Sequence, residues 1–448
     1  MTIDIGTYLK EHRVEEVECL IPDMTGNARG KLIPAKKFVK EESRLPESVL
    51  VQAVNGAWSD EHEELLGSDL DGDMVLQPDP STVRVVPWAK ESEPTVQIIH
   101  DCYTADGELH PLAARSVLRR VLELYEKEGW KPVIAPEAEF YFVQKNDNPD
   151  MELVPPIGRS GRHERPGQAY SIDAANEYED VIDDMYDYCD AMNLDLDTLI
   201  HESGAAQFEV NFLHGDPLDL ADQIFIFKRT VRETALRHDI YATFMAKPME
   251  KEPGSAMHIH QSVVDIKTGK NIFVDDKGEE NDLFRHYIGG LQKYTPYALA
   301  FYAPNVNSYR RFTKDIAAPI NLCWGYDNRT TGIRVPASSP QAKRVENRFP
   351  GMDANPYLAL AASLACGYLG MKQKIEPSEP TAHSAYEEDI AVARSLLEAL
   401  DLLRSCEPLA EVVGNRFVRA YCAVKEVEYE EFKKVISSWE REYLLLNV

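Results

Sequence analysis

The stretch Pro136-Glu137-Ala138-Glu139-Phe140-Tyr141-Phe142 is the strongest structural signal in this 448-residue sequence. As a β-strand with a side-chain period of two, it places its alanine and both phenylalanines on one face, and Glu137, Glu139 and Tyr141 on the other. Two carboxylates on one strand face repel each other unless water, a proton or a cation separates them. A single pair of this kind is explained by an edge strand with a solvent-exposed face. Whether Glu137 and Glu139 have a functional role therefore depends on the strands that follow.

Three later segments repeat this facial pattern. Their polar faces hold Glu209 and Asn211 in residues 208–212, His258, His260 and Ser262 in residues 256–262, and Arg344, Glu346 and Arg348 in residues 344–349. Glu202 precedes the first of these segments across Gly204. If the apolar faces pack beneath helices, the charged faces line a shared concavity, where charges are tolerated only when they are paired or bind metal.

The composition of these faces indicates the type of metal. Four glutamates with one or two imidazoles form a hard, oxygen-rich ligand set, which selects Mg²⁺ or Mn²⁺ over zinc. Nearby arginines, which a polyphosphate would need beside such metals, are Arg310, Arg311, Arg329 and Arg334. A solvated strand or a salt-bridge ladder would explain each segment alone, but four repeats of one pattern favour a metal–phosphate site. The sequence has no P-loop motif to hold a nucleotide in another way.

Composition excludes several classes of protein. The net charge of −27 argues against nucleic acid as a partner, because binding phosphates needs clustered Lys and Arg. We find neither a signal peptide nor an apolar run near the roughly 18 residues that a membrane span needs, so we expect a cytoplasmic protein without membrane contact. Seven scattered cysteines without a C-x-x-C pair suit a reducing compartment and argue against a cysteine-rich zinc site.

The chain divides near residues 104–107, and we predict a unit 1–106 and a unit 107–448. The first is strand-rich, with strands expected at 16–21, 82–86 and 95–100. The second alternates strands with helices and lacks the Gly-rich turns of a doubly wound sheet. Its helical patterns lie at 112–127, 176–193, 217–239, 286–302, 355–374, 388–402 and 427–441. We therefore predict an α+β fold with an antiparallel sheet and helices packed outside it.

Taken together, these stretches resemble the glutamine synthetase family, type I. The motifs that carry the resemblance are residues 136–140, His201-Glu202 with 207–210, 244–248, 254–260, 307–311, 328–330, 334–336 and 344–350. They occur in the family's order from about residue 55 to 370, and residues 73–79 match in the N-terminal part. The resemblance implies a small N-terminal β-grasp domain and a catalytic domain whose strands form half of an active-site barrel. It also implies a dodecamer of two stacked hexameric rings, with active sites between subunits.

The resemblance further implies roles for individual residues. Glu139, Glu202 and Glu209 would hold one divalent metal and Glu137, His258 and Glu346 another, with two or three Mg²⁺ or Mn²⁺ ions per site. His260, Ser262, Arg334 and Arg344 would contact ATP, and Gly254, Arg311 and Arg348 would bind glutamate. Arg329 would lie near the transferred phosphate, so Arg311, Arg329 and Arg348 are the catalytic candidates. The implied reaction is ATP-dependent ligation through γ-glutamyl phosphate.

Two departures from the family concern the nitrogen substrate. Asn55-Gly56-Ala57-Trp58 replaces an Asp-Gly-Ser-Ser loop whose aspartate deprotonates ammonium, and Ala317 replaces a flap glutamate. Losing two carboxylates removes the charges that bind a small cation, whereas Trp58 offers an apolar or cation–π surface. Both changes favour a primary amine over ammonium. Asn55, Trp58 and Ala317 are therefore our candidates for the amine site.

The sequence is most similar to the γ-glutamylputrescine synthetase branch of the family, which predicts putrescine or another polyamine as the acceptor. A γ-glutamylmethylamide or γ-glutamylethanolamide synthetase, a true glutamine synthetase, a metal-dependent amidohydrolase using His258 and His260, and a non-catalytic homologue stay open. Pro253 replaces a family asparagine that touches glutamate. The segment near Tyr386 is too short for a typical adenylylation loop, which argues against that form of control.

Overall fold

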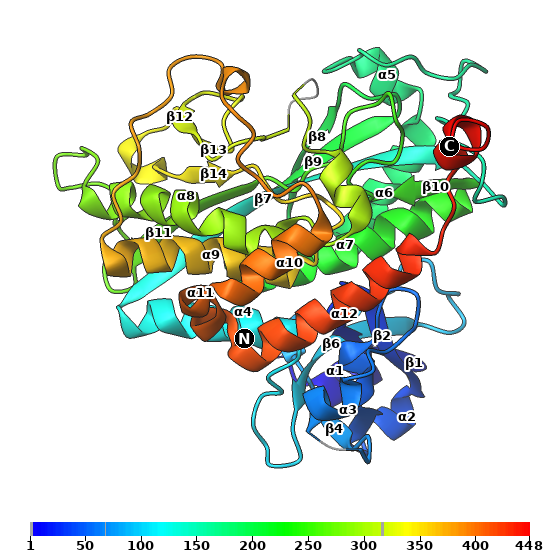
Figure 1. Cartoon of the computed structure of the whole chain (residues 1–448). Coiled ribbons are helices and arrows are strands. Elements are labelled where there is room, and N and C mark those ends of the chain that lie inside the picture. The colour runs from blue at the N-terminus through cyan, green and yellow to red at the C-terminus, as the bar shows by residue number, and fades with distance from the viewer. Residues whose placement is uncertain (1–2, 68, 315–317) are drawn as a thin grey trace.

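The computed structural model describes residues 3–67, 69–314 and 318–448, and it contains two β-sheets with helices packed around them (Figure 1). The N-terminal strands form a sheet of their own, blue at the bottom of the view. The second sheet lies above it among the helices of the larger unit. Ala317, one of the amine-site candidates, lies outside the described residues.

The first sheet has the strand order β2-β1-β6-β4-β3, with β5 also paired to β6. β1 and β6 run parallel, and the other pairs are antiparallel. The elements of this unit are α1 (Ile5–Glu11), β1 (Glu16–Pro22), β2 (Ala28–Pro34), α2 (Ala35–Phe38), β3 (Ser43–Pro46), η1 (Glu47–Val51), α3 (His62–Leu66), β4 (Asp73–Pro78), η2 (Pro80–Thr82), β5 (Arg84–Val85) and β6 (Thr95–Tyr103). The strand expected at 82–86 is shorter than predicted, because Asp79 caps a 3₁₀ turn that includes Thr82.

The second sheet has the order β12-β13-β14-β11-β7-β9-β8, with β10 also paired to β7. Its strands are β7 (Trp130–Gln144), β8 (Leu196–His201), β9 (Gln207–Phe212), β10 (Ile240–Thr243), β11 (Ile259–Asp265), β12 (Trp324–Tyr326), β13 (Ile333–Val335) and β14 (Val345–Asn347). Only the β12–β13 pair is parallel among the described strands of this sheet. The predicted α+β class, with a mainly antiparallel sheet and helices outside it, is confirmed.

Strand β7 is the long central strand of the second sheet. Its first half pairs with β11, and its second half pairs with β9 and β10. Ala138, Phe140 and Phe142 are fully buried in the main hydrophobic core, as their shared face predicted. Burial of these apolar side chains fixes the register of β7, so its polar face points away from the core.

Helices surround this sheet. They are α4 (Ala114–Lys127), α5 (Ile172–Asn176), α6 (Glu179–Ala191), α7 (Pro217–Arg237), α8 (Asp282–Tyr302), η3 (Val306–Arg310), η4 (Pro340–Ala342), α9 (Pro356–Gln373), η5 (Ala385–Glu387), α10 (Leu396–Ser405), α11 (Glu407–Val413), α12 (Asn415–Lys433) and α13 (Ser438–Tyr443). The helix expected at 388–402 begins only at Leu396, because Ser395 caps it. The helix expected at 427–441 is interrupted, because Ser437 and Glu440 form a capping box that starts α13. Within the described ranges, no helix is long and apolar enough to cross a membrane.

A buried charge network joins the N-terminal unit to helices α4 and α7. The Arg115 guanidinium contacts Asp101 at 2.6 Å, Asp79 at 2.7 Å and Asp222 at 2.8 Å. Asp79 and Asp101 belong to the N-terminal unit, whereas Arg115 and Asp222 lie on α4 and α7. Each charge is paired, as burial requires. The division into domains 1–106 and 107–448 stays a prediction.

Candidate active site

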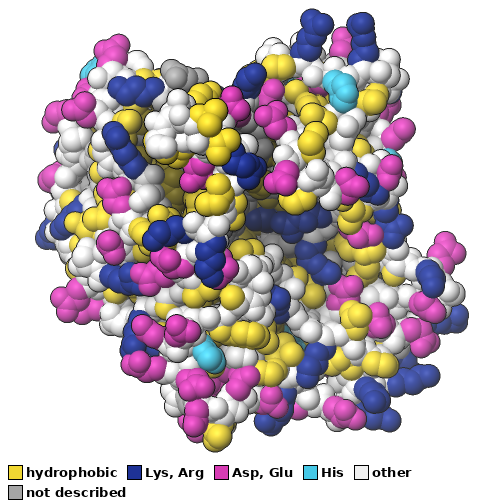
Figure 2. All heavy atoms as spheres, turned by 45° about the vertical axis from the view of Figure 1, so that its right-hand side comes forward, with side chains coloured by type: hydrophobic (Ala, Val, Ile, Leu, Met, Phe, Trp, Pro, Cys, Tyr) yellow, Lys and Arg dark blue, Asp and Glu magenta, His cyan; other side chains and the backbone are white. Residues whose placement is uncertain are grey.

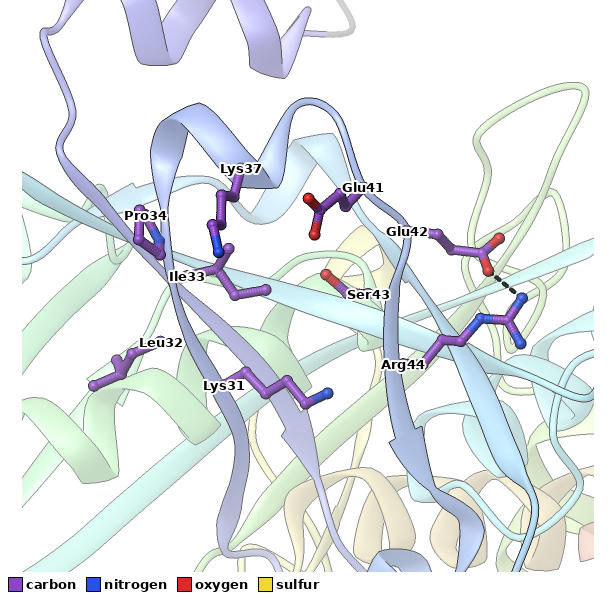
Figure 3. A pocket seen from close by; sticks show the side chains of 9 residues that line it. All are labelled: Lys31, Leu32, Ile33, Pro34, Lys37, Glu41, Glu42, Ser43 and Arg44. Carbon is purple, nitrogen blue, oxygen red and sulfur yellow. Dashed lines mark ion pairs between the residues drawn. The ribbon is translucent and has the colours of Figure 1, made fainter.

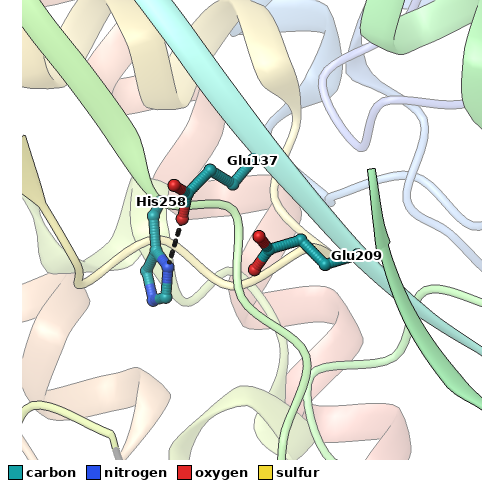
Figure 4. Close-up of side chains that lie close together, drawn as sticks. All are labelled: Glu137, Glu209 and His258. Atoms are coloured by element: carbon teal, nitrogen blue, oxygen red, sulfur yellow. Dashed lines mark hydrogen bonds and ion pairs between the residues drawn. The ribbon is translucent and has the colours of Figure 1, made fainter. Parts of the chain in front are cut away.

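The polar face of β7 contacts two histidines: His258, just before β11, and His260, on β11 itself. Glu137 Oε2 lies 2.9 Å from His258 Nδ1, and Glu137 Oε1 lies 3.0 Å from His260 Nε2. Figure 4 shows the first of these contacts, with the Glu209 carboxylate turned toward the same space. Main-chain pairing sets this arrangement, because Glu137 N–H donates to the His258 carbonyl at 2.9 Å. The sequence pattern therefore placed these side chains on one face correctly.

Glu346 on β14 connects this cluster to the arginines. Its carboxylate contacts Arg348 Nη1 and lies 2.7 Å from Arg334 Nη1. Arg344 Nε donates to His260 Nδ1 at 3.1 Å. Burial opposes ionisation here, but Arg348 and His260 lower the pKa of Glu346 to about 2. Glu346 is thus a paired, charged carboxylate whose side chain is only 1% exposed.

A second group of carboxylates lacks such pairing. Glu139 on β7 lies directly opposite Glu209 on β9, and each residue is 7% exposed. Burial and Glu202 raise the pKa of Glu139 to about 8, whereas burial and Glu137 raise the pKa of Glu209 to about 9. Burial also raises the pKa of Glu202. Like charges opposite each other on neighbouring strands are destabilising, so this group needs protons or a cation.

The donor set fits divalent metal ions. Two groups have ligand atoms within 4.8 Å of one another: Glu137, Glu209 and His258, and Glu137, His260 and Glu346. Burial and Arg348 lower the pKa of His258 to about 4, so at neutral pH its imidazole is neutral, as a metal ligand requires. Uncompensated carboxylates and neutral imidazoles suit Mg²⁺ or Mn²⁺. Glu137 belongs to both groups, so the predicted division of the ligands between two metals stays a prediction.

The candidates for glutamate binding lie beside these carboxylates. Arg311 is buried, and its guanidinium donates to the Phe349 carbonyl at 2.8 Å and to the Arg348 carbonyl at 3.0 Å. Burial, opposed by the Glu139 charge, lowers the pKa of Arg311 to about 10, so it still carries a proton at neutral pH. A Cβ added at Gly254 would lie 2.8 Å from the Arg311 side chain, so Gly254 and Arg311 are in contact. Glycine allows this close approach.

Other candidates occupy less enclosed positions. Arg329 is exposed on the loop between β12 and β13. Its charge is near enough to offset part of the rise that burial causes in the pKa of Glu202. Ser262 lies on β11, where it pairs with Val133 of β7. Figure 2 shows acidic and basic side chains interspersed over one face of the molecule, which is hollowed in its upper half.

The amine-site candidates Asn55 and Trp58 lie in the N-terminal unit of the chain. Asn55 Oδ1 accepts from Ala57 N–H at 3.1 Å, and Trp58 Nε1 donates to the Ser48 carbonyl at 3.2 Å. Trp58 is 45% exposed. None of these contacts involves a metal, ATP or glutamate candidate, so within the described chain the structure does not bring the two sets together.

A groove on the N-terminal unit is separate from all of these candidates. It lies between β2 and β3 and is lined by Lys31, Leu32, Ile33, Pro34, Lys37, Glu41, Glu42, Ser43 and Arg44 (Figure 3). Arg44 and Glu42 form an ion pair of 2.5 Å at its edge. Because it contains none of the predicted site residues, we do not include it in the active site.

Sequence reasoning missed two side chains that touch the candidate site. Tyr141 Oη donates to the Pro253 carbonyl at 2.7 Å, and Gln207 Nε2 donates to the Gly254 carbonyl at 3.0 Å. Tyr141 lies on the polar face of β7, so its strand position was a signal. Its partner is a main-chain carbonyl 112 residues away, which no local pattern indicates.

Comparisons with known proteins agree with this geometry. Residues 111–444 match the family model of the glutamine synthetase catalytic domain. Gamma-glutamylputrescine synthetase PuuA of Escherichia coli is 32% identical over 459 residues, covering 100% of this chain and 95% of that protein. A glutamine synthetase of Pyrococcus horikoshii is 35% identical, covering 94% and 90%. The solved structure of GmaS without ligand superposes with a TM-score of 0.83 at 28% identity and full coverage of both chains.

Proposed function

The chain belongs to the glutamine synthetase family and is an ATP-dependent ligase, and on this premise we propose that it joins the γ-carboxyl group of glutamate to a primary amine. We further propose putrescine or another polyamine as the amine. The observation that carries the proposal is that two groups of ionisable side chains, one of unpaired carboxylates and one of carboxylates paired with His and Arg, lie next to each other on one sheet. Uncompensated carboxylates at Glu139 and Glu209 lie beside the Glu137, His258 and Glu346 cluster with its arginines.

In the proposed reaction, the γ-carboxylate of glutamate attacks the γ-phosphate of ATP and forms γ-glutamyl phosphate, with ADP leaving. The amine nitrogen then attacks the acyl carbon, phosphate leaves, and the nitrogen gives up a proton. Divalent metal ions held by the six ligand candidates, Glu137, Glu139, Glu202, Glu209, His258 and Glu346, would neutralise phosphate charge. Arg311, Arg329 and Arg348 would supply fixed positive charge around glutamate and the transferred group.

Residues of β11 and β13, together with Arg344 just before β14, would hold ATP on the other side of the cluster. His260 and Arg344 are already joined by a hydrogen bond, and Arg334 is held by Glu346 and by Asp327 at 2.5 Å. These contacts pre-orient the cationic heads, so less conformational entropy is lost when a polyphosphate binds. Ser262 would contribute a hydroxyl from the same strand, β11.

The polyamine assignment has two supports. Gamma-glutamylputrescine synthetase PuuA is a relative over the whole chain. In addition, an exposed indole at Trp58 and an amide at Asn55 occupy the loop where the family has an acid. An apolar, aromatic surface suits the methylenes and ammonium group of an alkylamine. If subunits stack in two hexameric rings, as we also propose, this loop would complete the active site of a neighbouring subunit.

True glutamine synthesis is the second candidate function, because a glutamine synthetase of Pyrococcus horikoshii is 35% identical. One assay separates the two. ADP release is measured with ATP, Mg²⁺ and glutamate against putrescine, spermidine, methylamine, ethanolamine and ammonium. We expect kcat/KM to be highest for a diamine or polyamine. Ammonium as the best substrate would replace our proposal by the second candidate, and amide hydrolysis without ATP would indicate an amidohydrolase.

A further inference from the structure

We propose that Tyr141 and Gln207 are positioning residues for glutamate, which fix the main chain of the loop 252–255 from the side of the sheet. The inference rests on the proposed function and on the glutamate-binding role that the family resemblance implies for Gly254. Tyr141 and Gln207 act on two consecutive carbonyl groups. Neither needs to touch a substrate, so their effect would pass through the loop.

The contacts define a latch of two hydrogen bonds. Tyr141 Oη donates to the Pro253 carbonyl at 2.7 Å, and Gln207 Nε2 donates to the Gly254 carbonyl at 3.0 Å. The Gln207 amide is itself held, because its Oε1 accepts from Gly204 N–H at 3.0 Å. Tyr141 and Gln207 are nearly fully buried and pair directly with each other across β7 and β9. Buried partners with a fixed rotamer are suited to holding a main-chain position.

Close packing around the latch leaves little room for another loop conformation. A Cβ at Gly204 would lie 2.1 Å from Tyr141 Oη and 2.7 Å from Gln207 Oε1. A Cβ at Gly254 would lie 2.6 Å from the Ala246 carbonyl oxygen and 2.8 Å from Arg311 Cγ. Both positions therefore need glycine, one to admit the latch and one to let the loop lie against Arg311.

The latch also assigns Pro253 a structural role, which is to supply the main-chain carbonyl that Tyr141 binds. Proline has no side-chain polar group and fixes its own φ, so residue 253 contributes a rigid carbonyl and no side-chain contact to a ligand. The peptide bond between Pro253 and Gly254 is trans, so the Gly254 N–H points opposite to the carbonyl that Tyr141 binds. Holding that carbonyl therefore also sets the direction of the Gly254 N–H, which faces away from Tyr141.

Tyr141→Phe tests the latch, since it removes one hydroxyl and keeps the ring that fills the space. We expect KM for glutamate to rise about tenfold, because a buried carbonyl loses its donor and the loop loses its fixed position. We expect kcat and the KM values for ATP and amine to stay within about twofold. Gln207→Met is the second variant and should change the same parameter in the same direction.

Tyr178→Phe is a matched control. Tyr178 is buried against Phe142 and Phe208, and its hydroxyl donates to the carbonyl of another proline, Pro156, at 3.4 Å. It should leave KM for glutamate unchanged. An unchanged KM in Tyr141→Phe, an equal rise in Tyr178→Phe, or a loss spread over ATP and kcat would overturn the latch. If the wild-type protein shows no glutamate-dependent turnover with any amine, the proposed function itself fails.

Discussion

The catalytic sheet and the loop of Asn55 and Trp58 hold their residues in opposite ways. Four segments of the sheet bring buried ionisable side chains together. Some are in ion pairs, as Glu346 is with Arg348, and others, such as Glu139 and Glu209, have a raised pKa because they lack such a partner. The loop carries exposed side chains and is fixed through its main chain. Substituting one buried charged residue of the sheet disturbs the residues that contact it, whereas substituting an exposed residue of the loop does not disturb a hydrophobic core. We infer that the sheet performs the shared chemistry of the family and that the loop selects the acceptor.

The loop is nevertheless ordered by specific contacts. Ala53 N–H donates to the Ala57 carbonyl at 2.9 Å, and Gln52 Nε2 donates to the Gly56 carbonyl at 2.8 Å. Gly56 has a φ of 86°, which a residue with a side chain adopts with strain. Tight turns of this kind present side chains in one direction at low entropic cost.

Removing one carboxylate from the sheet should have the largest effect of all. We expect Glu139→Ala to lower kcat by at least about a thousandfold, because it deletes a proposed metal ligand and a charge on which several pKa values depend. Steady-state ADP release with glutamate and the best amine measures this loss. Glu411→Ala, an exposed glutamate on α11, is the control and should keep wild-type activity. Near-normal turnover in Glu139→Ala would contradict the metal assignment.

The same carboxylate gives an opposite prediction for stability. Glu139→Gln should raise the melting temperature of protein treated with a chelator at neutral pH. Burial and Glu202 raise the pKa of Glu139 to about 8, so the wild-type carboxyl must take up a proton on folding, whereas glutamine has no charge to neutralise. Added Mg²⁺ should stabilise the wild type more than the variant, since ligand binding to the folded state adds to its stability. Melting curves with and without Mg²⁺ check this. A lower melting temperature for the metal-free variant would mean that Glu139 is favourably paired.

Changing the loop should alter the choice of amine and leave the sheet's chemistry intact. We expect Trp58→Ala to raise KM for the amine about tenfold, which corresponds to the loss of one cation–π contact. KM values for ATP and glutamate should not change. Trp58→Phe keeps a smaller aromatic face and should give an intermediate value. Equal changes in all three KM values would show that the loop acts on the whole site and does not select the acceptor.

The charged faces of the sheet could be predicted from the sequence because the alternation of side chains along a strand depends only on neighbouring residues. A period of two put Glu137 and Glu139 opposite the fully buried Phe140, and the antiparallel pairing with β9 and β11 brought Glu209 and His258 to the same place. The pairing itself was not visible in the sequence. Neither was the sharing of Glu137 by two ligand groups, because that depends on distances between strands.

Other features escaped prediction for physical reasons. Strand β2 is exposed along most of its length, so it lacks the apolar alternation that marks a half-buried strand. The contact between Tyr141 and Pro253 joins a side chain to a main-chain carbonyl, and carbonyl groups have no sequence signature. The contact that fastens the loop of Asn55 to α12 joins the Val54 N–H to Glu428, 374 residues away, and a main-chain N–H has no sequence signature either.

That contact gives the smallest expected effect. Glu428 on α12 accepts from Val54 N–H at 2.8 Å, and its other oxygen binds Lys425 at 2.7 Å in a buried pair. In Glu428→Gln the carboxamide oxygen can still accept from Val54, but the charge that orders it is lost. Because the hydrogen bond from Val54 persists, we expect KM for the amine to rise only about two- to threefold, with KM for ATP unchanged. Glu426→Gln, on the same helix but paired with Arg404 at the surface, is the matched control. A shift in amine KM for Glu428→Gln alone would show that α12 positions the acceptor loop, whereas equal shifts in both variants would assign the effect to the charge of the helix.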